Sequence, residues 1–330
     1  MMQIAGQRNA SRAGRWLVTA LLAATAWSAQ AQTPVADGRA LDFVVIFPAG
    51  ASADVSARIL AEGMSQHLKQ PVPVSNRPGG GGAVGYKYVA ASRPDGRTMV
   101  WNSNSISTTH YSGVMDIDYK AFEPVARVTI EIPLVVVQAS SPWKTLNEML
   151  DYARVNPGML KVGNSGTGSH THMTSVALFD AAGAKVLEVP FSATQVVPSL
   201  LGGHVDALVQ LPGAVVPHVK SGALRVLGVL GSKRDPLFPD VPTARETGLV
   251  MLPMDLWRGV GVAKGTPKPV IARLEKAVEA ALRRPEFVSA GEKFGFLPAF
   301  LPSAEFGRLI ARDDEIIGHQ MKLLGMTKAR

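Results

Sequence analysis

Cysteine is absent from all 330 residues of the chain. This absence excludes disulfide bonds, thiol catalysis and thiolate metal sites, so stability has to come from burying apolar side chains in a sizeable core. Beyond its first 31 residues the chain also lacks an apolar run of the roughly 18 to 20 residues that a transmembrane helix needs. We therefore expect no insertion into a membrane.

A concentrated positive charge is missing as well. The formal net charge is +8, but Arg8, Arg12 and Arg15 lie in the first 31 residues, so the remainder carries 8 − 3 = +5. Lys and Arg are otherwise scattered, apart from pairs such as Lys233-Arg234. A protein that reads nucleic acid concentrates these residues on one face or one helix, so nucleic acid is not an expected partner.

The first 31 residues have the three zones of a cleavable secretory signal. A basic leader without acidic residues precedes the mostly apolar stretch 16–27, and Ala29-Gln30-Ala31 provides a small-x-small cleavage site. No twin-arginine pair is present, and no cysteine follows that would carry a lipid. We expect cleavage after Ala31, a mature chain of 330 − 31 = 299 residues, and a location in the periplasm.

The mature chain alternates short apolar segments with stretches of helical spacing. Strands are indicated at 41–47, 72–75, 98–102, 132–138, 161–164, 186–189, 205–210, 224–230 and 258–263. Two intervening helices are expected to open with capping boxes, Thr145 with Glu148 and Thr243 with Glu246. The alternation predicts an α/β fold with mostly parallel sheets, each flanked by helices. Crossings near 132 and between 248 and 257 predict a discontinuous first domain, 32–131 plus 255–330, and a second domain, 132–254.

A glycine run at 76–85 has two interpretations. Gly80, Gly82 and Gly85 satisfy the dinucleotide-binding expression G-x-G-x-x-G, but no acidic residue follows at the required distance of about 20 positions. The run also fits a tight turn that leads into a helix, because glycine readily adopts positive φ. We favour the turn and expect no cofactor.

The segment 163–170 is the second loop of small residues. Ser165 fails the nucleophile-elbow expression because Thr167 replaces its second glycine, and His170 directly follows Ser169, so the two do not face each other on a helix. His170 and His172 diverge as metal ligands, and no metal is expected. The segment is better explained as a loop that opens a helix at about 169–182, whose free N–H groups bind a carboxylate.

Loops of this composition follow several strands, at 48–54, 102–105, 163–170 and 191–194. Ligands of open α/β sheets bind at the carboxyl ends of strands. Asp54 either caps the helix that begins beside it, or orders its loop and accepts a hydrogen bond from a ligand. Because the loops offer donors without a pair of base and nucleophile, they indicate binding rather than catalysis.

The ordered motifs of the chain resemble the substrate-binding proteins of tripartite tricarboxylate transporters, called Bug receptors in Bordetella and relatives. The resemblance covers about 40 to 325 and rests on Phe47-Pro48-Ala49-Gly50 with Asp54, Asn76-Arg77-Pro78-Gly79, Pro94-Asp95-Gly96, Gly163 to His170, Val189-Pro190-Phe191, Leu201 to Asp206, Pro217 to Lys220, Asp240 to Thr243 and Gly265-Thr266-Pro267-Lys268. It implies a type II-like periplasmic binding fold of two domains that closes on a small ligand, typically a carboxylate. It also implies delivery to the membrane subunits of a secondary transporter.

The candidate ligand-binding residues come from the small-residue loops and from these motifs together. They are Phe47, Ala49, Gly50, Ala51, Ser52, Asp54, Ser103, Asn104, Ser165, Gly166, Thr167, Ser169, His170, Ser192, Ala193, Thr194 and Gln210. The chain departs from the family pattern at Ala51, Ala53, Ser192 and Gln210, which replace a glycine, a hydroxyl, a lysine and an acid and favour a more neutral or aromatic ligand. Arg258, near the second crossing, is a candidate replacement cation.

The function predicted by these features is an extracytoplasmic receptor, expected as a monomer, for a small organic anion. Two alternatives stay open. One is a secreted hydrolase that uses Ser165 or Ser169 with a histidine from elsewhere, and the other is the same binding fold acting as a sensor that presents its closed form to a signalling receptor.

Overall fold

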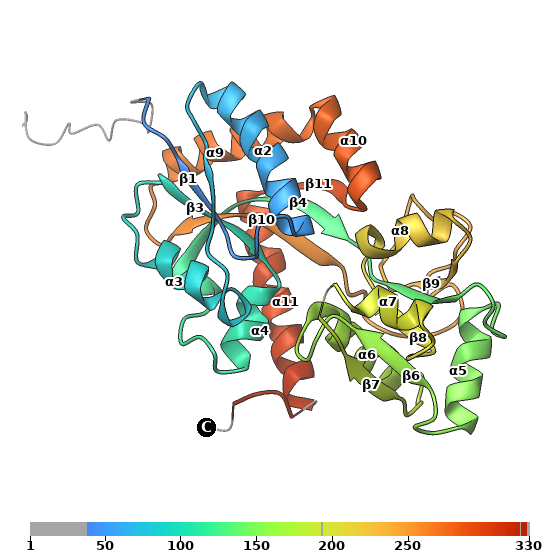
Figure 1. Ribbon diagram of the computed structural model, residues 1–330. Helices are drawn as coiled ribbons and strands as arrows, with labels where there is room; N and C mark the ends of the chain where they lie inside the picture. The colour runs from blue at the N-terminus through green and yellow to red at the C-terminus, as the bar shows by residue number, and fades with distance from the viewer. Residues whose placement is uncertain (1–37, 193, 324, 329–330) are drawn as a thin grey trace, which may run out of the picture.

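The computed structural model describes residues 38–192, 194–323 and 325–328. The expected signal at 1–31 and its cleavage site lie outside the described residues, as does Ala193. Figure 1 shows two domains, which we call the larger domain (upper left) and the smaller domain (green and yellow, lower right). Among the described helices, none combines the length and the apolar character needed to cross a bilayer.

The larger domain is built on a six-stranded sheet in the order β11-β4-β10-β3-β1-β2. Its strands are β1 (Asp42–Val45), β2 (Val74–Asn76), β3 (Thr98–Ser103), β4 (Phe122–Glu131), β10 (Leu256–Ala263) and β11 (Leu297–Pro302). One face packs against α2 (Ser52–Leu68), α9 (Lys268–Leu282) and α10 (Pro285–Phe294). The opposite face packs against α3 (Ala83–Ala90), α4 (Ser105–Tyr111) and α11 (Ser303–Leu323). The two short helical turns are η1 (Gly80–Gly82) and η2 (Tyr119–Ala121).

The smaller domain is built on a five-stranded sheet in the order β7-β6-β8-β5-β9. Its strands are β5 (Leu134–Gln138), β6 (Lys161–Asn164), β7 (Leu187–Pro190), β8 (Ala207–Gln210) and β9 (Leu224–Val229). One face packs against α5 (Leu146–Val155) and α6 (His170–Ala181), and the other packs against α7 (Val196–Leu201) and α8 (Pro212–Lys220).

Both sheets are mixed, which corrects the expectation of mostly parallel sheets. In the larger domain β1 is parallel to β2 and β3, but β10 is antiparallel to β3 and β4, and β11 is antiparallel to β4. In the smaller domain β6 is parallel to β7 and β8, while β5 is antiparallel to β8 and β9. The reason lies in the chain path, because β5 and β10 each enter their sheet directly from the other domain and run back along their neighbours.

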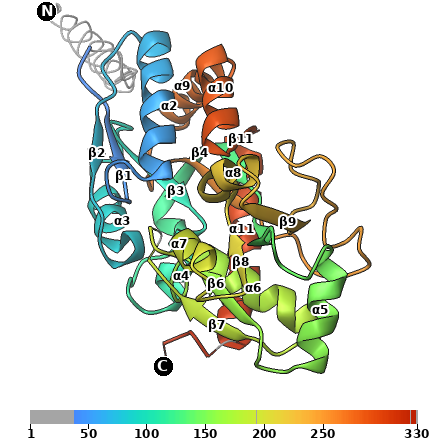
Figure 2. The same cartoon turned by 45° about the vertical axis from the view of Figure 1, so that its right-hand side comes forward.

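Two segments connect the domains. Residues 132–133 lead from β4 to β5, and residues 230–255 lead from β9 back to β10. Helix α11 also reaches the smaller domain, where Ile317 and Met321 pack with Met173 of α6 and Met254 of the second connection. Figures 1 and 2 both place α8 beside the end of α10, so the domains also approach each other away from the contact made by α11.

Of the two helices predicted from capping boxes, one is present and one is not. Thr145 accepts a hydrogen bond from Glu148 N at 3.2 Å and caps α5, as expected. The capping box of Thr243 and Glu246 forms both of its hydrogen bonds but closes only a turn, so the helix expected there is wrong. Gly248, at φ +90°, ends this turn within two residues of Glu246.

The glycine run forms the turn that we favoured over a dinucleotide loop. Gly79 to Gly82 all have positive φ, and α3 follows at Ala83. A Cβ on Gly85 would lie 2.7 Å from Ile46 Cγ2, so glycine is also required where α3 meets the sheet. The turn and the close approach of α3 to the sheet therefore account for the glycine run.

Candidate functional site

The carboxyl ends of the parallel strands in both sheets lie at the edges that face the connections. Glu131, at the end of β4, pairs with Leu256, and Leu134 pairs with Gln210 at the end of β8. Ser103 pairs with Arg258, so the end of β3 lies at the same edge of the larger sheet. The loops that follow β1, β3, β6 and β8 are thus brought together around the two connections.

The first loop, between β1 and α2, is ordered by Asp54. Its Oδ2 accepts hydrogen bonds from Gly50 N at 2.9 Å and Arg58 Nε at 3.0 Å, and its Oδ1 accepts one from Asn76 Nδ2 at 2.8 Å. Burial favours a raised pKa for Asp54, but the hydrogen bonds from Arg58, Gly50 and Asn76 outweigh it and the pKa is lowered. The N-cap position of α2 is Ala51, so Asp54 orders the loop from the first turn rather than from the cap.

Removing the Asp54 carboxylate is expected to loosen this loop. Asp54→Ala leaves the Gly50 amide, the Asn76 amide and Arg58 without their acceptor, and we expect the free energy of unfolding to fall by about 2 to 3 kcal/mol. Chemical denaturation measures the change. Asp151→Ala, which removes an exposed carboxylate paired with Arg154, is the control and should change stability by less than about 0.5 kcal/mol. Equal effects of the two variants would refute the structural role of Asp54.

The remaining residues of the first loop leave its surface largely open. Ala49, Gly50 and Ser52 are exposed, Ala51 and Phe47 are partly buried, and Asn76 Nδ2 also donates to the Phe47 carbonyl oxygen at 3.1 Å. The loop after β3 is different. Ser103 and Asn104 are buried, and Asn104 Oδ1 accepts a hydrogen bond from Trp257 N at 2.9 Å. Asn104 therefore joins the end of β3 to the start of β10.

The second loop, between β6 and α6, is held by a network of hydroxyl and amide groups. Ser165 N donates to Thr171 Oγ1 at 2.9 Å, and Gln210 Nε2 donates to Ser165 Oγ at 2.8 Å. Ser169 caps α6 by accepting from His172 N at 3.1 Å, and α6 lies where the sequence predicted a helix. Within the described residues, the N–H groups of His170 and Thr171 have no hydrogen-bond acceptor. They remain available at the positive end of the helix dipole.

Asn164 supports this loop from below. Its Oδ1 accepts from Gly166 N at 3.1 Å, and its Nδ2 donates to Glu188 Oε2 at 2.9 Å. The other oxygen of Glu188 accepts from Ser175 Oγ at 2.7 Å. Burial raises the pKa of Glu188 against the opposing effect of these two hydrogen bonds. Sequence reasoning missed the role of Glu188, since nothing in its local pattern distinguishes it from a surface glutamate.

His170 connects the second loop to the second connection. Its Nε2 donates to the Met254 carbonyl oxygen at 2.6 Å, and burial lowers the pKa of His170 to about 4, with a further contribution from the charge of Arg258. The imidazole is therefore neutral above about pH 4. Its neighbour His172 is engaged separately, with Nδ1 accepting from Gly168 N at 3.1 Å.

The lowered pKa of His170 has a consequence for stability. The unfolded chain takes up this proton near pH 6.5 and the folded chain only near pH 4, so stability is lost as the pH falls between these values. We expect a loss of about 2 to 3 kcal/mol by pH 4.5, and its absence in His170→Gln. Urea unfolding at pH 7.5 and 4.5 tests this.

The pH dependence of stability has to be compared between the native chain and His170→Gln. Burial raises the pKa of Asp255 to about 6, so Asp255 contributes with the opposite sign in the same pH range. Asp255 is present in both proteins, and the difference between them isolates His170. The same dependence on pH in both proteins would contradict the assignment.

The third loop, which leads from β7 to α7, and Gln210 flank the second loop. Ser192 and Thr194 are exposed, and Ser192 Oγ donates to Gln195 Oε1 at 2.9 Å. Gln210 is buried, and its Oε1 accepts from Leu211 N at 2.8 Å. Gln210 and Ser165 are thus in direct contact, whereas the side-chain hydrogen bonds of Ser192 in the described part of the chain go to Thr194 and Gln195.

Glu131 and Arg258, two charged residues beside the connections between the domains, form a buried ion pair at the site. We call this region, where the two connections cross between the domains, the hinge. Arg258 Nε donates to Glu131 Oε1 at 2.8 Å, and the side chains are only 8% and 2% exposed. The guanidinium carbon of Arg258 lies 5.6 Å from the centre of the Phe47 ring. Sequence reasoning named Arg258 but missed Glu131, because their pairing depends on the register of β4 against β10.

Neither serine of the hydrolase interpretation is paired with a base. In the described part of the chain, the hydrogen bonds of Ser165 Oγ and Ser169 Oγ go to Gln210, Thr171 and a backbone amide. A nucleophilic serine needs a histidine or another base within hydrogen-bond reach. The geometry therefore gives the hydrolase interpretation no support.

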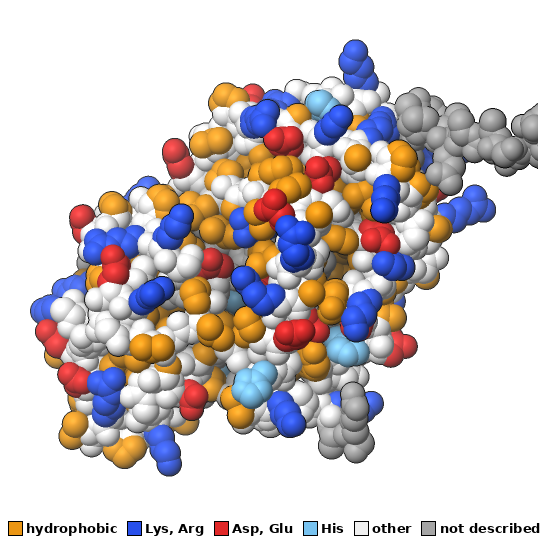
Figure 3. Space-filling view, turned by 180° about the vertical axis from the view of Figure 1, so that it is seen from behind, with side chains coloured by type: hydrophobic (Ala, Val, Ile, Leu, Met, Phe, Trp, Pro, Cys, Tyr) orange, Lys and Arg blue, Asp and Glu red, His pale blue; other side chains and the backbone are white. Residues whose placement is uncertain are grey.

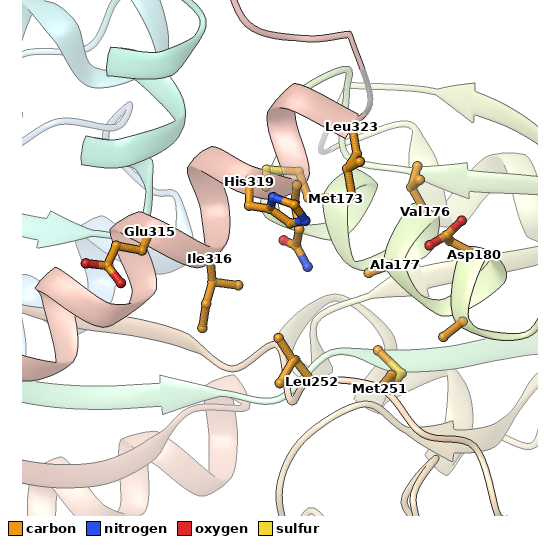
Figure 4. Close-up of a pocket in the computed structure, with 12 residues that line it drawn as sticks. Met173, Val176, Ala177, Asp180, Met251, Leu252, Glu315, Ile316, His319 and Leu323 are labelled. Atoms are coloured by element: carbon orange, nitrogen blue, oxygen red, sulfur yellow. The ribbon is translucent and has the colours of Figure 1, made fainter.

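A cavity of about 630 Å³ lies elsewhere, between α6 and α11 (Figure 4). Val176, Ala177 and Asp180 on α6 face Ile316, His319 and Leu323 on α11, with Met251 and Leu252 at its base. None of the candidate ligand-binding residues is among the residues that line it. Its apolar walls and the carboxylates of Asp180 and Glu315 make it unsuitable for a small organic anion.

On the face seen from behind, Lys and Arg side chains are interspersed with Asp and Glu (Figure 3).

Comparison with known proteins places this geometry in context. The model of a family described as the tripartite tricarboxylate transporter family receptor matches residues 56–325. A UPF0065 protein in the gbd 5' region of Cupriavidus necator is 32% identical over 97% of this chain and 98% of its own. Protein BugT of Bordetella pertussis is 32% identical over 84% of this chain and 86% of its own.

Solved structures agree. A TctC solute-binding protein from Polaromonas superposes with a TM-score of 0.78 at 30% identity, covering 87% of this chain and 99% of that one. The R. palustris protein Rpa4515, solved with adipate, superposes with a TM-score of 0.77 at 27% identity, covering 88% and 99%. The expected two-domain α/β fold and the resemblance noted from the sequence are both confirmed.

Proposed function

The chain belongs to the tripartite tricarboxylate transporter receptor family, and from this premise we propose that it captures a small carboxylate between its two domains and delivers it to a membrane transporter. The observation that carries the proposal is the convergence of two donor-rich loops, 47–54 and 164–171, on the hinge at the carboxyl edges of the two sheets. Binding at such edges is general for open α/β folds.

The donors around the hinge suit an anion. The N–H groups of His170 and Thr171 begin α6, and the hydroxyl groups of Ser165 and Ser192 border the same loops. Asp54 is paired with Arg58, and Glu188 accepts hydrogen bonds from Asn164 and Ser175, so both carboxylates already have protein partners. The relative Rpa4515 was solved with adipate, a dicarboxylate, which supports the same ligand class here.

The finer features of the proposal follow from the family and the leader. Family members act in the periplasm, and we propose that this chain is exported, cleaved after Ala31 and active as a monomer that binds without catalysis. Its domains would be 32–131 with 255–330, and 132–254, closing by hinge motion at the two connections. The candidate residues named from the sequence, including Ala193 outside the described part, form its ligand-binding set.

Thermal unfolding of the mature chain tests this function. The panel contains succinate, glutarate, adipate and benzoate, each with its amide as the matched neutral control. A ligand at 100 times its Kd adds about 2.7 kcal/mol to stability, and we expect at least one acid to raise Tm by about 5 °C or more while its amide does not. No shift with any acid would contradict carboxylate binding. Conversion of an amide or ester, lost in Ser169→Ala, would instead favour the hydrolase.

A further inference from the structure

Arg258 is a buried cation whose hydrogen-bonding capacity is only partly used. The residue is 7% exposed, and its one described side-chain hydrogen bond runs from Nε to Glu131. Its two terminal nitrogens have no hydrogen-bond partner in the part of the chain that the structure describes. A buried guanidinium is stable only when its remaining N–H groups are satisfied, so these nitrogens need an acceptor from solvent or from a ligand.

The position of Arg258 connects the loops of the proposed site. It pairs with Ser103 in the sheet, and its guanidinium lies beside Phe47 at the start of the first loop. Its charge also acts on His170 in the second loop, where it adds to the effect of burial in lowering the pKa of His170. Arg258 therefore lies at the floor of the site, within reach of both domains.

Three carboxylates around this floor already accept hydrogen bonds from protein groups. Asp54 binds Arg58 and Asn76, Glu131 binds Arg258, and Glu188 binds Asn164 and Ser175. His170 donates to the Met254 carbonyl oxygen and is neutral above about pH 4. None of these three carboxylates is left for a ligand ammonium, and a further one, Asp255, has a buried Oδ1 that is unpartnered among the described residues and a pKa that burial raises to about 6. The terminal nitrogens of Arg258 match the two oxygens of a carboxylate.

We propose that Arg258 determines the specificity of the site by binding one carboxylate of the ligand through its two terminal nitrogens, and that the ligand is a carboxylic acid without an amino group. The inference rests on the proposed function and narrows its ligand class. The aromatic ring of Phe47 then packs beside the bound carboxylate, and the free N–H groups of α6 receive the polar atoms at the other end of the ligand.

Calorimetric titration tests the role of Arg258, with adipate, 2-aminoadipate, adipamide and benzoate as probes. We expect the native protein to bind adipate or benzoate. If adipate is the acid that binds, adipamide and 2-aminoadipate should each bind at least about 100-fold more weakly than adipate. The variant Glu131→Gln/Arg258→Gln removes both buried charges together and should lose about 100-fold in affinity for the acid. Arg258→Lys keeps the charge without the planar fork and should lose about tenfold.

The control is Arg234→Gln/Glu246→Gln, which removes an exposed ion pair of the same residue types within the second connection. It should bind the acid as the native protein does. Acid affinity within threefold of native in Glu131→Gln/Arg258→Gln would overturn the role of Arg258 while leaving the proposed function intact. Preferred binding of 2-aminoadipate would overturn the ligand class. No binding of adipate, benzoate, succinate or glutarate to the native protein or to the control would overturn both proposals.

Discussion

Arg258→Gln is expected to lower the free energy of unfolding by about 3 to 5 kcal/mol. The substitution leaves Glu131, whose side chain is 2% exposed, as a buried carboxylate without its cationic partner. The penalty arises from the remaining charge rather than from the lost bond, so replacing both residues should recover most of the stability. Denaturant unfolding of Arg258→Gln, Glu131→Gln and the double variant measures the coupling.

The exposed pair Arg234 and Glu246 provides the comparison. Both side chains are more than 40% exposed, so Arg234→Gln should change stability by less than about 1 kcal/mol. If Arg258→Gln were as mild as Arg234→Gln, the buried ion pair would not hold β10 to β4 as described. A double variant less stable than Arg258→Gln alone would lead to the same conclusion.

Gly213→Val is expected to weaken ligand binding by about 10- to 100-fold, since overpacking a close contact costs about 1 to 3 kcal/mol. Gly213 lies at the start of α8 in the smaller domain, and a Cβ there would lie 2.4 Å from the carbonyl oxygen of Phe294 at the end of α10. Gly295 approaches Gly213 with its own backbone in the same contact. A side chain at 213 therefore holds the domains apart.

The measurement for Gly213→Val is the affinity for whichever acid of the panel binds the native protein most tightly. Lys220→Val is the matched control, because it places the same side chain at the exposed far end of the same helix. It should leave the affinity unchanged. If Gly213→Val bound the acid as tightly as Lys220→Val, approach of α8 to α10 would play no part in binding.

The sequence placed the loops of the candidate site at strand ends correctly, whereas it predicted the strand directions of both sheets wrongly. The loops at 47–54 and 164–171 could be placed together because parallel strands of an α/β fold end at one edge. Asp54 was identified from helix-start chemistry, although it acts from the first turn rather than from the cap, and the helix expected at about 169–182 begins where Ser169 caps α6. Local chemistry of this kind is readable from neighbouring residues alone.

Features that depend on pairing between distant strands were not readable. Glu131 and Arg258 are 127 residues apart and meet only because β4 and β10 pair in one register. Strand β4 was missed because charged residues and Pro124 interrupt its apolar pattern, and β11 was missed because it begins and ends near prolines. The antiparallel strand directions could not be predicted for the same reason, since the direction of a strand depends on how the chain crosses between the domains.

The most direct test of the account is a crystal structure of the mature chain with the acid that gives the largest thermal shift. The account predicts that the acid lies between loops 47–54 and 164–171, with one carboxylate on the terminal nitrogens of Arg258 and α8 in contact with the end of α10. Density for the acid in the cavity between α6 and α11, or no acid at the hinge at saturating concentration, would contradict it.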